Sequence, residues 1–154
     1  MLRRIPRTLP AVLWLLAACG PLFITPKPLS ETRRIPSGQQ FKTIATIATS
    51  SSQTGIGVEV HVRQRLLKAG IKAVPSAGRW NSDQEARDAV CAKPDASPNA
   101  VLMVSSAELQ LFPCGDREPA YTVQGAAAEG GPGIDAMTKA LIRYLLGQPP
   151  PPKK

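Results

Sequence analysis

The sequence predicts a small mixed α/β domain (class α/β, α+β) in which three helices pack on a mixed four-stranded sheet. Three observations predict this class. Short β-branched apolar runs alternate with longer segments of helical periodicity, glycines and prolines separate these segments, and the elements follow the order β-α-β-α-β-β-α. A chain of 154 residues suits one such domain with a single main core.

The domain is expected to begin with a strand and a helix. Residues 41–49 are rich in isoleucine and threonine, which favours a strand, and a run of serines follows them. In residues 56–69 the valines alternate as in a strand, but four apolar residues also lie on one helical face and Gly70 stands where a helix would stop. We therefore predict a helix here. Its apolar face comprises Val58, Val62, Leu66 and Ala69.

A second strand and a second helix follow. Residues 71–74 are short and apolar and end at Pro75, which favours a strand. The right-handed crossover rule makes this strand parallel to the first if the two share a sheet. Ser82 and Glu85 have the spacing of a capping box, in which the hydroxyl accepts from a backbone amide ahead and the carboxylate from one behind. We expect the second helix to run from Ser82 to about Cys91.

Two more strands and a helix complete the predicted domain. Residues 101–112 form one long strand candidate, with aliphatic side chains on one face and polar ones on the other. A turn-like stretch around Gly115 lets residues 120–126 return as its hairpin partner. After a glycine-rich break, an amphipathic helix closes the domain. Its apolar face comprises Ile134, Met137, Leu141 and Leu145, widened by Ala140 and Tyr144.

The first eighteen residues have the layout of a secretory signal. Three arginines precede an apolar stretch, and small residues stand before Cys19. The apolar stretch, residues 11–18, is much shorter than the roughly 20 residues that a helix needs to span a bilayer. We therefore predict that residues 1–18 are a signal peptide and that the chain is exported.

Leu16, Ala17, Ala18 and Cys19 match the four positions of the bacterial lipoprotein box, so this segment resembles the leader of bacterial lipoproteins. The resemblance implies cleavage before Cys19, a thioether-linked diacylglycerol on its sulfur and acylation of the new amino terminus. Acyl chains anchor a protein without a spanning helix, because each buried methylene contributes about 0.8 kcal/mol. Gly20 after the cysteine favours the outer membrane by the same resemblance. The alternative is an ordinary signal peptide in which Cys19 is merely a small residue.

Proline-rich segments flank the predicted domain. Residues 19–40 hold several prolines and few large apolar groups, so we expect a lipidated, weakly ordered tether with a reach of about 25 Å if flexible and about 60 Å if polyproline-like. The α/β periplasmic domain then covers residues 41–147. Residues 148–154 contain four consecutive prolines, which exclude a helix or an inner strand. We expect a disordered, solvated tail, with a ligand for a partner's groove as the alternative.

The predicted layout resembles that of small bacterial envelope lipoproteins whose domain is similar to the amino-terminal domain of TolB and to the curli-secretion lipoprotein. The resemblance covers about residues 41–146. It rests on the order of elements, on the strand at 41–49, on the helix-to-strand passage at 65–71 and on the closing helix. These are packing signals, so the resemblance implies a fold more than an activity.

Few side chains of this chain offer catalytic or metal-binding chemistry. His61 is the single histidine and has no Asp or Glu three or four residues away, so we expect no catalytic residue, no metal site and no cofactor. No serine lies in a G-x-S-x-G motif. Cys91 and Cys114 are expected to form a disulfide that closes a loop of about 24 residues, with two buried free thiols as the alternative.

The charge pattern argues against nucleic acid as a partner. Removing the three arginines of the signal lowers the formal charge from +8 to +5, and aromatic residues are not interleaved with the basic ones. We expect a non-enzymatic lipoprotein that the acyl chains hold on the outer membrane, facing the periplasm, where it binds another envelope protein or has a structural role. An accessory role in an envelope transport or secretion complex is the alternative, and an enzyme comes third. The sequence leaves the oligomeric state open.

Overall fold

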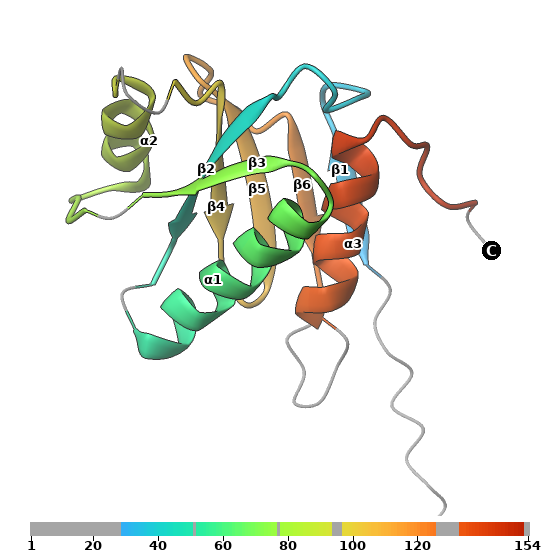
Figure 1. Cartoon of the computed structure of the whole chain (residues 1–154), viewed down its shortest axis with the longest axis horizontal. Coiled ribbons are helices and arrows are strands. Elements are labelled where there is room, and N and C mark those ends of the chain that lie inside the picture. The colour runs from blue at the N-terminus through green and yellow to red at the C-terminus, as the bar shows by residue number, and fades with distance from the viewer. Residues whose placement is uncertain (1–28, 51, 77, 94–96, 126–132, 153–154) are drawn as a thin grey trace, which may run out of the picture.

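A computed structural model gives the fold of this chain and describes residues 29–50, 52–76, 78–93, 97–125 and 133–152. Within these residues, six strands form one mixed sheet in the order β1-β6-β5-β4-β2-β3, and three helices pack on it (Figure 1). The mixed α/β class and the three helices are as predicted. The elements are β1 (Ser30–Arg33), β2 (Thr43–Ala48), α1 (Gln53–Lys68), β3 (Lys72–Pro75), α2 (Asp83–Cys91), β4 (Ala100–Val104), β5 (Glu108–Pro113), β6 (Tyr121–Gln124) and α3 (Gly133–Leu145).

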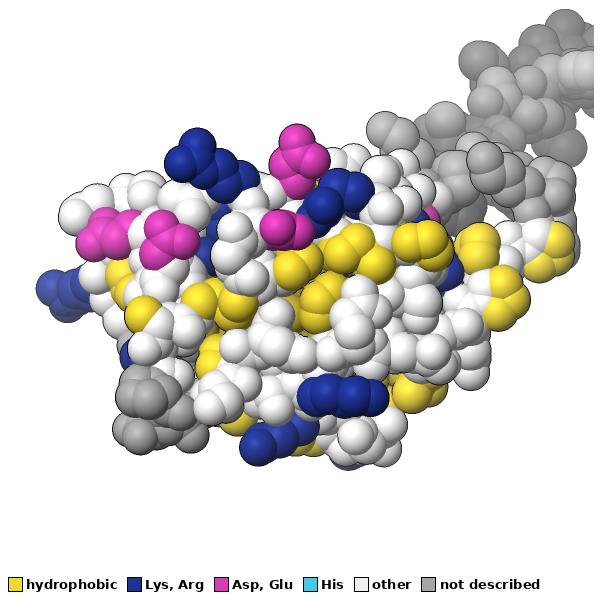
Figure 2. All heavy atoms as spheres, turned by 90° about the horizontal axis from the view of Figure 1, so that it is seen from above, with side chains coloured by type: hydrophobic (Ala, Val, Ile, Leu, Met, Phe, Trp, Pro, Cys, Tyr) yellow, Lys and Arg dark blue, Asp and Glu magenta, His cyan; other side chains and the backbone are white. Residues whose placement is uncertain are grey.

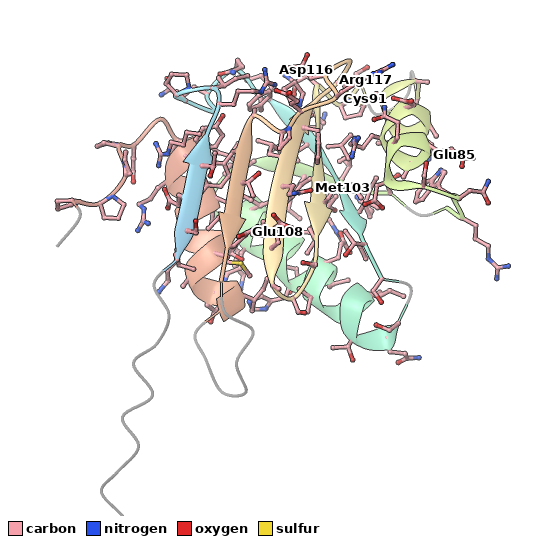
Figure 3. All side chains as sticks on the ribbon, turned by 180° about the vertical axis from the view of Figure 1, so that it is seen from behind. Glu85, Cys91, Met103, Glu108, Asp116 and Arg117 are labelled. Carbon is pink, nitrogen blue, oxygen red and sulfur yellow. A yellow bond between two sulfur atoms is a disulfide. The ribbon has the colours of Figure 1, made fainter. Side chains whose placement is uncertain are left out.

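The helices form a layer on each side of the sheet. α1 and α3 cover one face, which we call the front, and their buried residues share the main core with those of β2, β4, β5 and β6. α2 lies on the back face, where a smaller core surrounds Val90, Val101 and Phe112. Figure 3 shows the back face: α2 stands at one side and reaches Phe112 of β5, and no helix of the described residues covers the rest of β5, β6 or β1. The uncovered strands present polar side chains, such as Gln110 and Thr122, to solvent.

The middle of the sheet is parallel and fully buried. β2 pairs in parallel with both β3 and β4, which confirms the predicted parallel arrangement of the first two predicted strands. All five residues of β4 are buried, as expected for a strand covered on both faces. The antiparallel pairs β4–β5, β5–β6 and β6–β1 extend the sheet from there.

The prediction of one long strand over residues 101–112 is wrong, because the chain reverses inside it. The hydroxyl of Ser105 accepts from the backbone amides of Ala107 at 3.3 Å and of Glu108 at 2.9 Å, and this closes a tight turn between β4 and β5. The turn also changes which side chains share a face: Val101 packs in the back core, whereas Leu109 packs in the front core. Two strands therefore stand where the sequence predicted one.

The second correction concerns the predicted tether and the predicted four strands. Residues 30–33 form β1, which pairs antiparallel with β6, so Ser30 lies beside Gln124 and Arg33 beside Tyr121. The backbone amides of Arg34 and Ile35 both donate to the carbonyl oxygen of Ala120, at 2.9 and 3.1 Å. The folded unit thus includes residues 29–40, and the described sheet has six strands. Local sequence does not reveal β1, because its partner lies far along the chain.

The helix boundaries follow capping side chains. α1 begins at Gln53, three residues before the predicted start, because Ser52 caps it by accepting from the amide of Gly55 at 3.1 Å. Ser82 caps α2 by accepting from the amide of Glu85 at 3.1 Å, as predicted. The carboxylate of Glu85 reaches one residue further back than expected and accepts from the amide of Asn81 at 2.9 Å.

Shortening the mature chain from its amino end tests the corrected boundary. We take residues 19–154 with Cys19→Ser as the reference and compare chains that begin at Leu29 or at Phe41. The chain that begins at Phe41 lacks β1 and leaves the edge of β6 unpaired, so it should lose at least about 2 kcal/mol of unfolding free energy in urea. The chain that begins at Leu29 should match the reference. Equal urea midpoints for both shortened chains would show that β1 does not contribute to the fold.

Candidate interaction surface at the far end of the sheet

The two ends of the sheet differ in what they present to solvent. At one end, which we call the near end, the chain enters β1 at Ser30. In the strand register, Ser30 lies beside Gln124 of β6, which in turn lies beside Glu108 of β5. The opposite end, the far end, carries the loops of residues 34–42 and 114–120. Three sets of contacts organise these loops.

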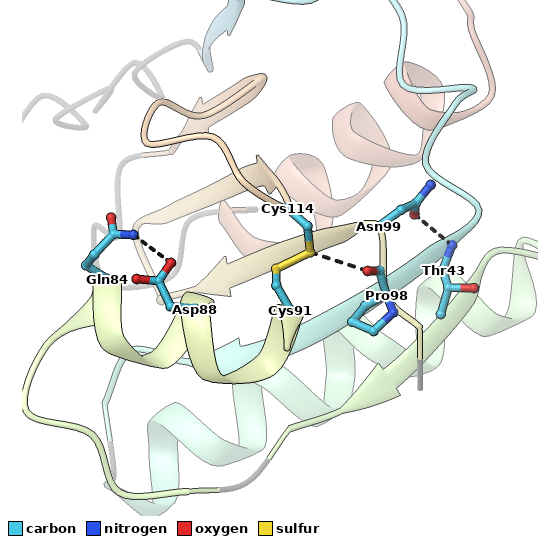
Figure 4. The surroundings of a disulfide bond; sticks show 7 residues. All are labelled: Thr43, Gln84, Asp88, Cys91, Pro98, Asn99 and Cys114. Atoms are coloured by element: carbon cyan, nitrogen blue, oxygen red, sulfur yellow. Dashed lines mark hydrogen bonds between the residues drawn. A yellow bond between two sulfur atoms is a disulfide. The ribbon is translucent and has the colours of Figure 1, made fainter. Parts of the chain in front are cut away.

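A disulfide ties α2 to the far end. Cys91, the last residue of α2, is bonded to Cys114, which directly follows β5, and their Cα atoms lie 5.6 Å apart (Figure 4). The sulfur of Cys114 also lies 3.3 Å from the carbonyl oxygen of Pro98. This is the pairing that the sequence led us to expect. An isolated helix as short as α2 is marginal in water, so the bond helps to keep it on the sheet.

The side chain of Asn99 joins two far-end loops. Its Oδ1 accepts from the backbone amide of Thr43 at 3.1 Å (Figure 4). It also accepts from the backbone amide of Lys42 at 3.0 Å, and Nδ2 of Asn99 donates to the carbonyl oxygen of Gln40 at 2.7 Å. The backbone amide of Asn99 also donates to the carbonyl oxygen of Thr43 at 3.0 Å. The start of β2 is therefore fixed against the start of β4.

Arg34 holds the turn between β5 and β6. Its guanidinium lies 2.6 Å from the carboxylate of Asp116 and donates to the carbonyl oxygens of Glu118 and Pro119, each at 3.1 Å. The two charged side chains are 39% and 46% exposed, so solvent screens their attraction and the ion pair itself adds little stability. Three contacts from one side chain nevertheless fix the position of this loop.

The far end presents apolar side chains inside a charged rim. Asp116, Arg117 and Cys91 lie together at the top of Figure 3, and the view from above shows hydrophobic atoms in a broken band across the middle, with charged side chains above, below and to the left of it (Figure 2). The apolar residues of the far-end loops include exposed Pro36 and partly buried Ile35, Pro113 and Pro119. Exposed charged residues of this end include Lys42, Lys72 and Arg117. An apolar centre with a polar rim is the usual anatomy of a protein–protein interface, and loops that are already fixed lose little entropy on binding.

A cluster of ionic and aromatic side chains lies beneath this surface, between β1, β6 and α3. Tyr121 and Tyr144 stack with ring centroids 4.3 Å apart, and the guanidinium of Arg33 lies 5.4 Å from the Tyr144 centroid and 5.9 Å from the Tyr121 centroid. The carboxylate of Glu31 lies 3.4 Å from Arg33 and 3.7 Å from Arg143. The cluster therefore attaches β1 to α3 through side chains as well as through the sheet.

Burial changes the acidity of the two tyrosines. Their hydroxyl oxygens are buried and make no hydrogen bond of normal geometry with the described residues. Loss of hydration raises the pKa of Tyr121 far above its usual range, and the nearby carboxylate of Glu31 raises it further. Burial also raises the pKa of Tyr144. Both rings therefore stay neutral well above neutral pH.

A buried carboxylate links α1 to the sheet and was not expected from the sequence. Glu59 is 7% exposed, accepts from Nε of Arg63 at 2.9 Å and accepts from the hydroxyl of Thr46 on β2. The hydroxyl of Thr46 also lies 3.3 Å from the carbonyl oxygen of Val74 on β3. The spacing of Glu59 and Arg63 is visible in the sequence, but only the packing shows that this pair faces the sheet. Because the carboxylate has partners, we interpret the group as structural.

His61 has an acidic neighbour that the search by sequence spacing missed. It is exposed on α1, and its Nε2 lies 2.9 Å from Oδ1 of Asp135 on α3, an oxygen that Arg65 also contacts at 2.6 Å. These two contacts lower the pKa of Asp135 below its usual value. Asp135 lies 74 residues from His61 along the chain, beyond any helical spacing rule.

The described residues contain no group of three or more His, Cys, Asp or Glu side chains that could hold a metal ion. In the same residues, no helix is both long enough and apolar enough to cross a membrane. Cys19, the predicted lipidation site, and the predicted signal peptide lie outside the described residues.

Replacing each cysteine of the disulfide by serine tests the bond. In the Cys19→Ser chain, Cys91→Ser and Cys114→Ser should each lower the unfolding free energy by about 3 kcal/mol, because either change frees a loop of roughly 24 residues in the unfolded chain. The double variant should lose no more than the larger single loss, and dithiothreitol should bring the parent down to the same value. Unequal single losses measured by urea unfolding would contradict a shared bond.

Removing one tyrosine hydroxyl tests the buried cluster at high pH. In the unfolded chain Tyr121 loses its proton near pH 10, whereas the folded state keeps it, so stability should fall as the pH rises above about 10. Tyr121→Phe should reduce this fall and change the unfolding free energy at pH 7 by less than about 1 kcal/mol, since the hydroxyl makes no hydrogen bond of normal geometry with the described residues. Urea unfolding between pH 7 and 11 measures both effects. An unchanged alkaline slope would contradict the burial of this hydroxyl.

No protein-family model matches this chain, and no curated protein matches it. The solved structures similar to it include two of PelC dodecamers from Paraburkholderia phytofirmans. A point variant of PelC is 13% identical, with a TM-score of 0.45 over 78% of this chain and 95% of that one. Another PelC structure is 11% identical, with a TM-score of 0.46 over 80% of this chain and 99% of that one. We therefore argue function from the residues of this chain alone.

Proposed function

We propose that this protein is a lipid-anchored component of a bacterial cell envelope that binds another envelope protein through the far end of its domain, without catalysis. The observation that carries this proposal is the sequence Leu16-Ala17-Ala18-Cys19, placed directly after a basic and an apolar segment. Acyl chains on Cys19 would hold the protein on the outer membrane, with the domain in the periplasm.

The disulfide supports an exported location. Disulfides persist in oxidising compartments such as the bacterial periplasm and are rare in the cytosol. Cys91 and Cys114 are joined and both are partly exposed, so a reducing compartment would leave them open to reduction. A structural bond at this position therefore agrees with removal of the chain from the cytoplasm.

The position of β1 sets how far the domain can stand from the membrane. Ten residue steps separate Cys19 from Leu29, where the described fold begins, and such a segment reaches at most about 35 Å. A folded unit of this size is roughly 36 Å across. Because the anchor segment is no longer than the domain and attaches at the near end, the near end would remain on the membrane side and the far end would face the periplasm.

The chemistry of the far end supports binding to a protein. Its apolar centre can exclude water and its rim offers cations that solvent or a partner can reach, such as Lys42 and Arg117. The contacts of Arg34 and Asn99 fix the loops that carry these groups. The near end differs, since Glu108 there is engaged by the amide side chains of Gln110 and Gln124, at 3.1 and 2.8 Å.

Lipidation is tested by expressing the full chain in a bacterium with the lipoprotein pathway and separating membranes from soluble periplasm. We expect the parent to sediment with membranes, with an intact mass equal to residues 19–154 plus acyl chains and less two hydrogens for the disulfide. Cys19→Ser should leave the membrane fraction or accumulate as uncleaved precursor. The matched control, Cys91→Ser with Cys114→Ser, should stay acylated. An unmodified Cys19 in the mature protein would refute the proposal.

A further inference from the structure

The chain after α3 is fixed to the fold up to Gln148. Gly147 adopts a positive φ of 75° and turns the chain, and the amide of Gln148 then donates to the carbonyl oxygen of Arg143 at 2.8 Å, which is a helix-ending pattern. Two side-chain hydrogen bonds also hold this segment, one from the loop after β1 and one from β1 itself. Gln39 donates to the carbonyl oxygen of Leu146 at 3.3 Å, and Arg33 donates to that of Gln148 at 3.0 Å. The fold thus determines where the next residues leave the domain.

The four residues that follow have their conformation set by their covalent structure. Pro149, Pro150, Pro151 and Pro152 each have φ near −65° because of the ring. A residue before a proline is driven to extended ψ values, and this applies to Gln148 and to the first three prolines. The segment is therefore a polyproline II helix of about 12 Å, at roughly 3.1 Å per residue. The range of its backbone conformations is therefore restricted before any partner binds.

This segment is exposed and cannot join the sheet. All four prolines are exposed, and Figure 1 shows the red segment after α3 running away from the body of the domain. Proline has no backbone N–H, so the segment offers only carbonyl acceptors and the flat faces of its rings. It leaves beside Arg33, at the far end of β1, and so on the side that faces away from the anchor in the proposed arrangement.

The sequence gives this segment two further features, a characteristic spacing of prolines and a positive charge directly after them. Pro149 and Pro152 have the P-x-x-P spacing whose two prolines occupy neighbouring grooves in polyproline-binding domains, and Lys153 and Lys154 follow at once. In such domains the grooves are lined by aromatic rings. Two lysines next to the prolines would be matched by carboxylates beside those grooves.

We propose that Pro149–Pro152 are a preformed polyproline II ligand for an envelope protein with an aromatic-lined groove flanked by acidic side chains, which the charges of the two following lysines would complement. The proposal rests on the envelope location argued above and names the partner's chemistry. A disordered, solvated tail is the other interpretation. The two differ in what they require, since a solvated tail tolerates any polar residues, whereas a groove ligand needs Pro149 and Pro152.

Photocrosslinking in living cells tests the proposal on the full chain. A benzophenone amino acid replaces Lys154, and the same group at Gln64, which is exposed on α1, is the control. We expect a protein adduct from position 154 that falls about tenfold in a Pro149→Ala and Pro152→Ala background, because the groove contacts and the preformed conformation are lost together. Mass spectrometry should place the adduct beside aromatic and acidic residues of the partner.

Every other result overturns the proposal. No adduct, an adduct that persists when both prolines are replaced, or an adduct to another copy of this chain would each show that the prolines are not a groove ligand. The double variant should have the same urea midpoint as the parent, because the replaced side chains are exposed, so a lost adduct cannot be attributed to misfolding.

The contribution of the lysine charge is tested by Lys153→Ser in the chain that carries the photocrosslinker at position 154. This change should reduce the yield of the adduct without abolishing it. Intact mass of the same samples reports acylation at Cys19, so failure of the anchor and failure of the ligand are distinguishable.

Discussion

The whole architecture depends on the burial of β4 on both of its faces. Five consecutive apolar residues, Ala100–Val104, alternate between the front and the back of the sheet, so neither face can be left open at this position. On the front, α1 and α3 supply a broad apolar layer. On the back, α2 is the helix of the described residues that provides cover, and it is short. The disulfide and the contact of the Arg87 guanidinium with the Phe112 ring, 3.9 Å from its centroid, hold that cover in place.

A helix has to cover the back of the sheet only where that face is apolar. Beyond β4 and Phe112 of β5 the back face becomes polar, since the rest of β5, β6 and β1 present threonine, glutamine and glutamate side chains there. An antiparallel sheet can leave such a face in water. The division of the back face into a covered apolar half and an open polar half is thus a direct result of which residues alternate in each strand. It also explains why one small helix is sufficient on that side.

The same contacts that close the domain also shape its far end. The disulfide, the amide of Asn99 and the guanidinium of Arg34 each join segments that are distant in sequence, and all three act on far-end loops. A surface fixed in this way is suited to binding, because little conformational entropy remains to be lost. The chain enters β1 at the other end of the sheet, so the proposed membrane side and the proposed partner side are separated by the length of the strands. The proline segment leaves the fold on the partner side.

The sequence by itself determined the features that depend on near neighbours. Ser82 starts α2 through an amide three residues ahead, Gly70 with its positive φ follows the end of α1, and the parallel pairing of β2 and β3 follows from a single crossover. The lipoprotein box and the proline run are equally local. The pairing of Cys91 and Cys114 was open to prediction for another reason: they are the two cysteines whose thiols stay free if Cys19 is lipidated as predicted.

Only the tertiary structure decided the features that join distant segments. β1 has no strong strand pattern of its own and exists because β6 offers it an edge, with Arg33 reaching a carbonyl 115 residues away. The turn at Ser105 divides an apolar run whose alternation continues through it, so the pattern alone cannot show the reversal. The partners of Glu59 and Asp135 come from other elements, and no spacing rule reaches them. Local rules describe one element at a time, whereas an edge strand, a buried charge and a binding surface exist only after the elements have packed together.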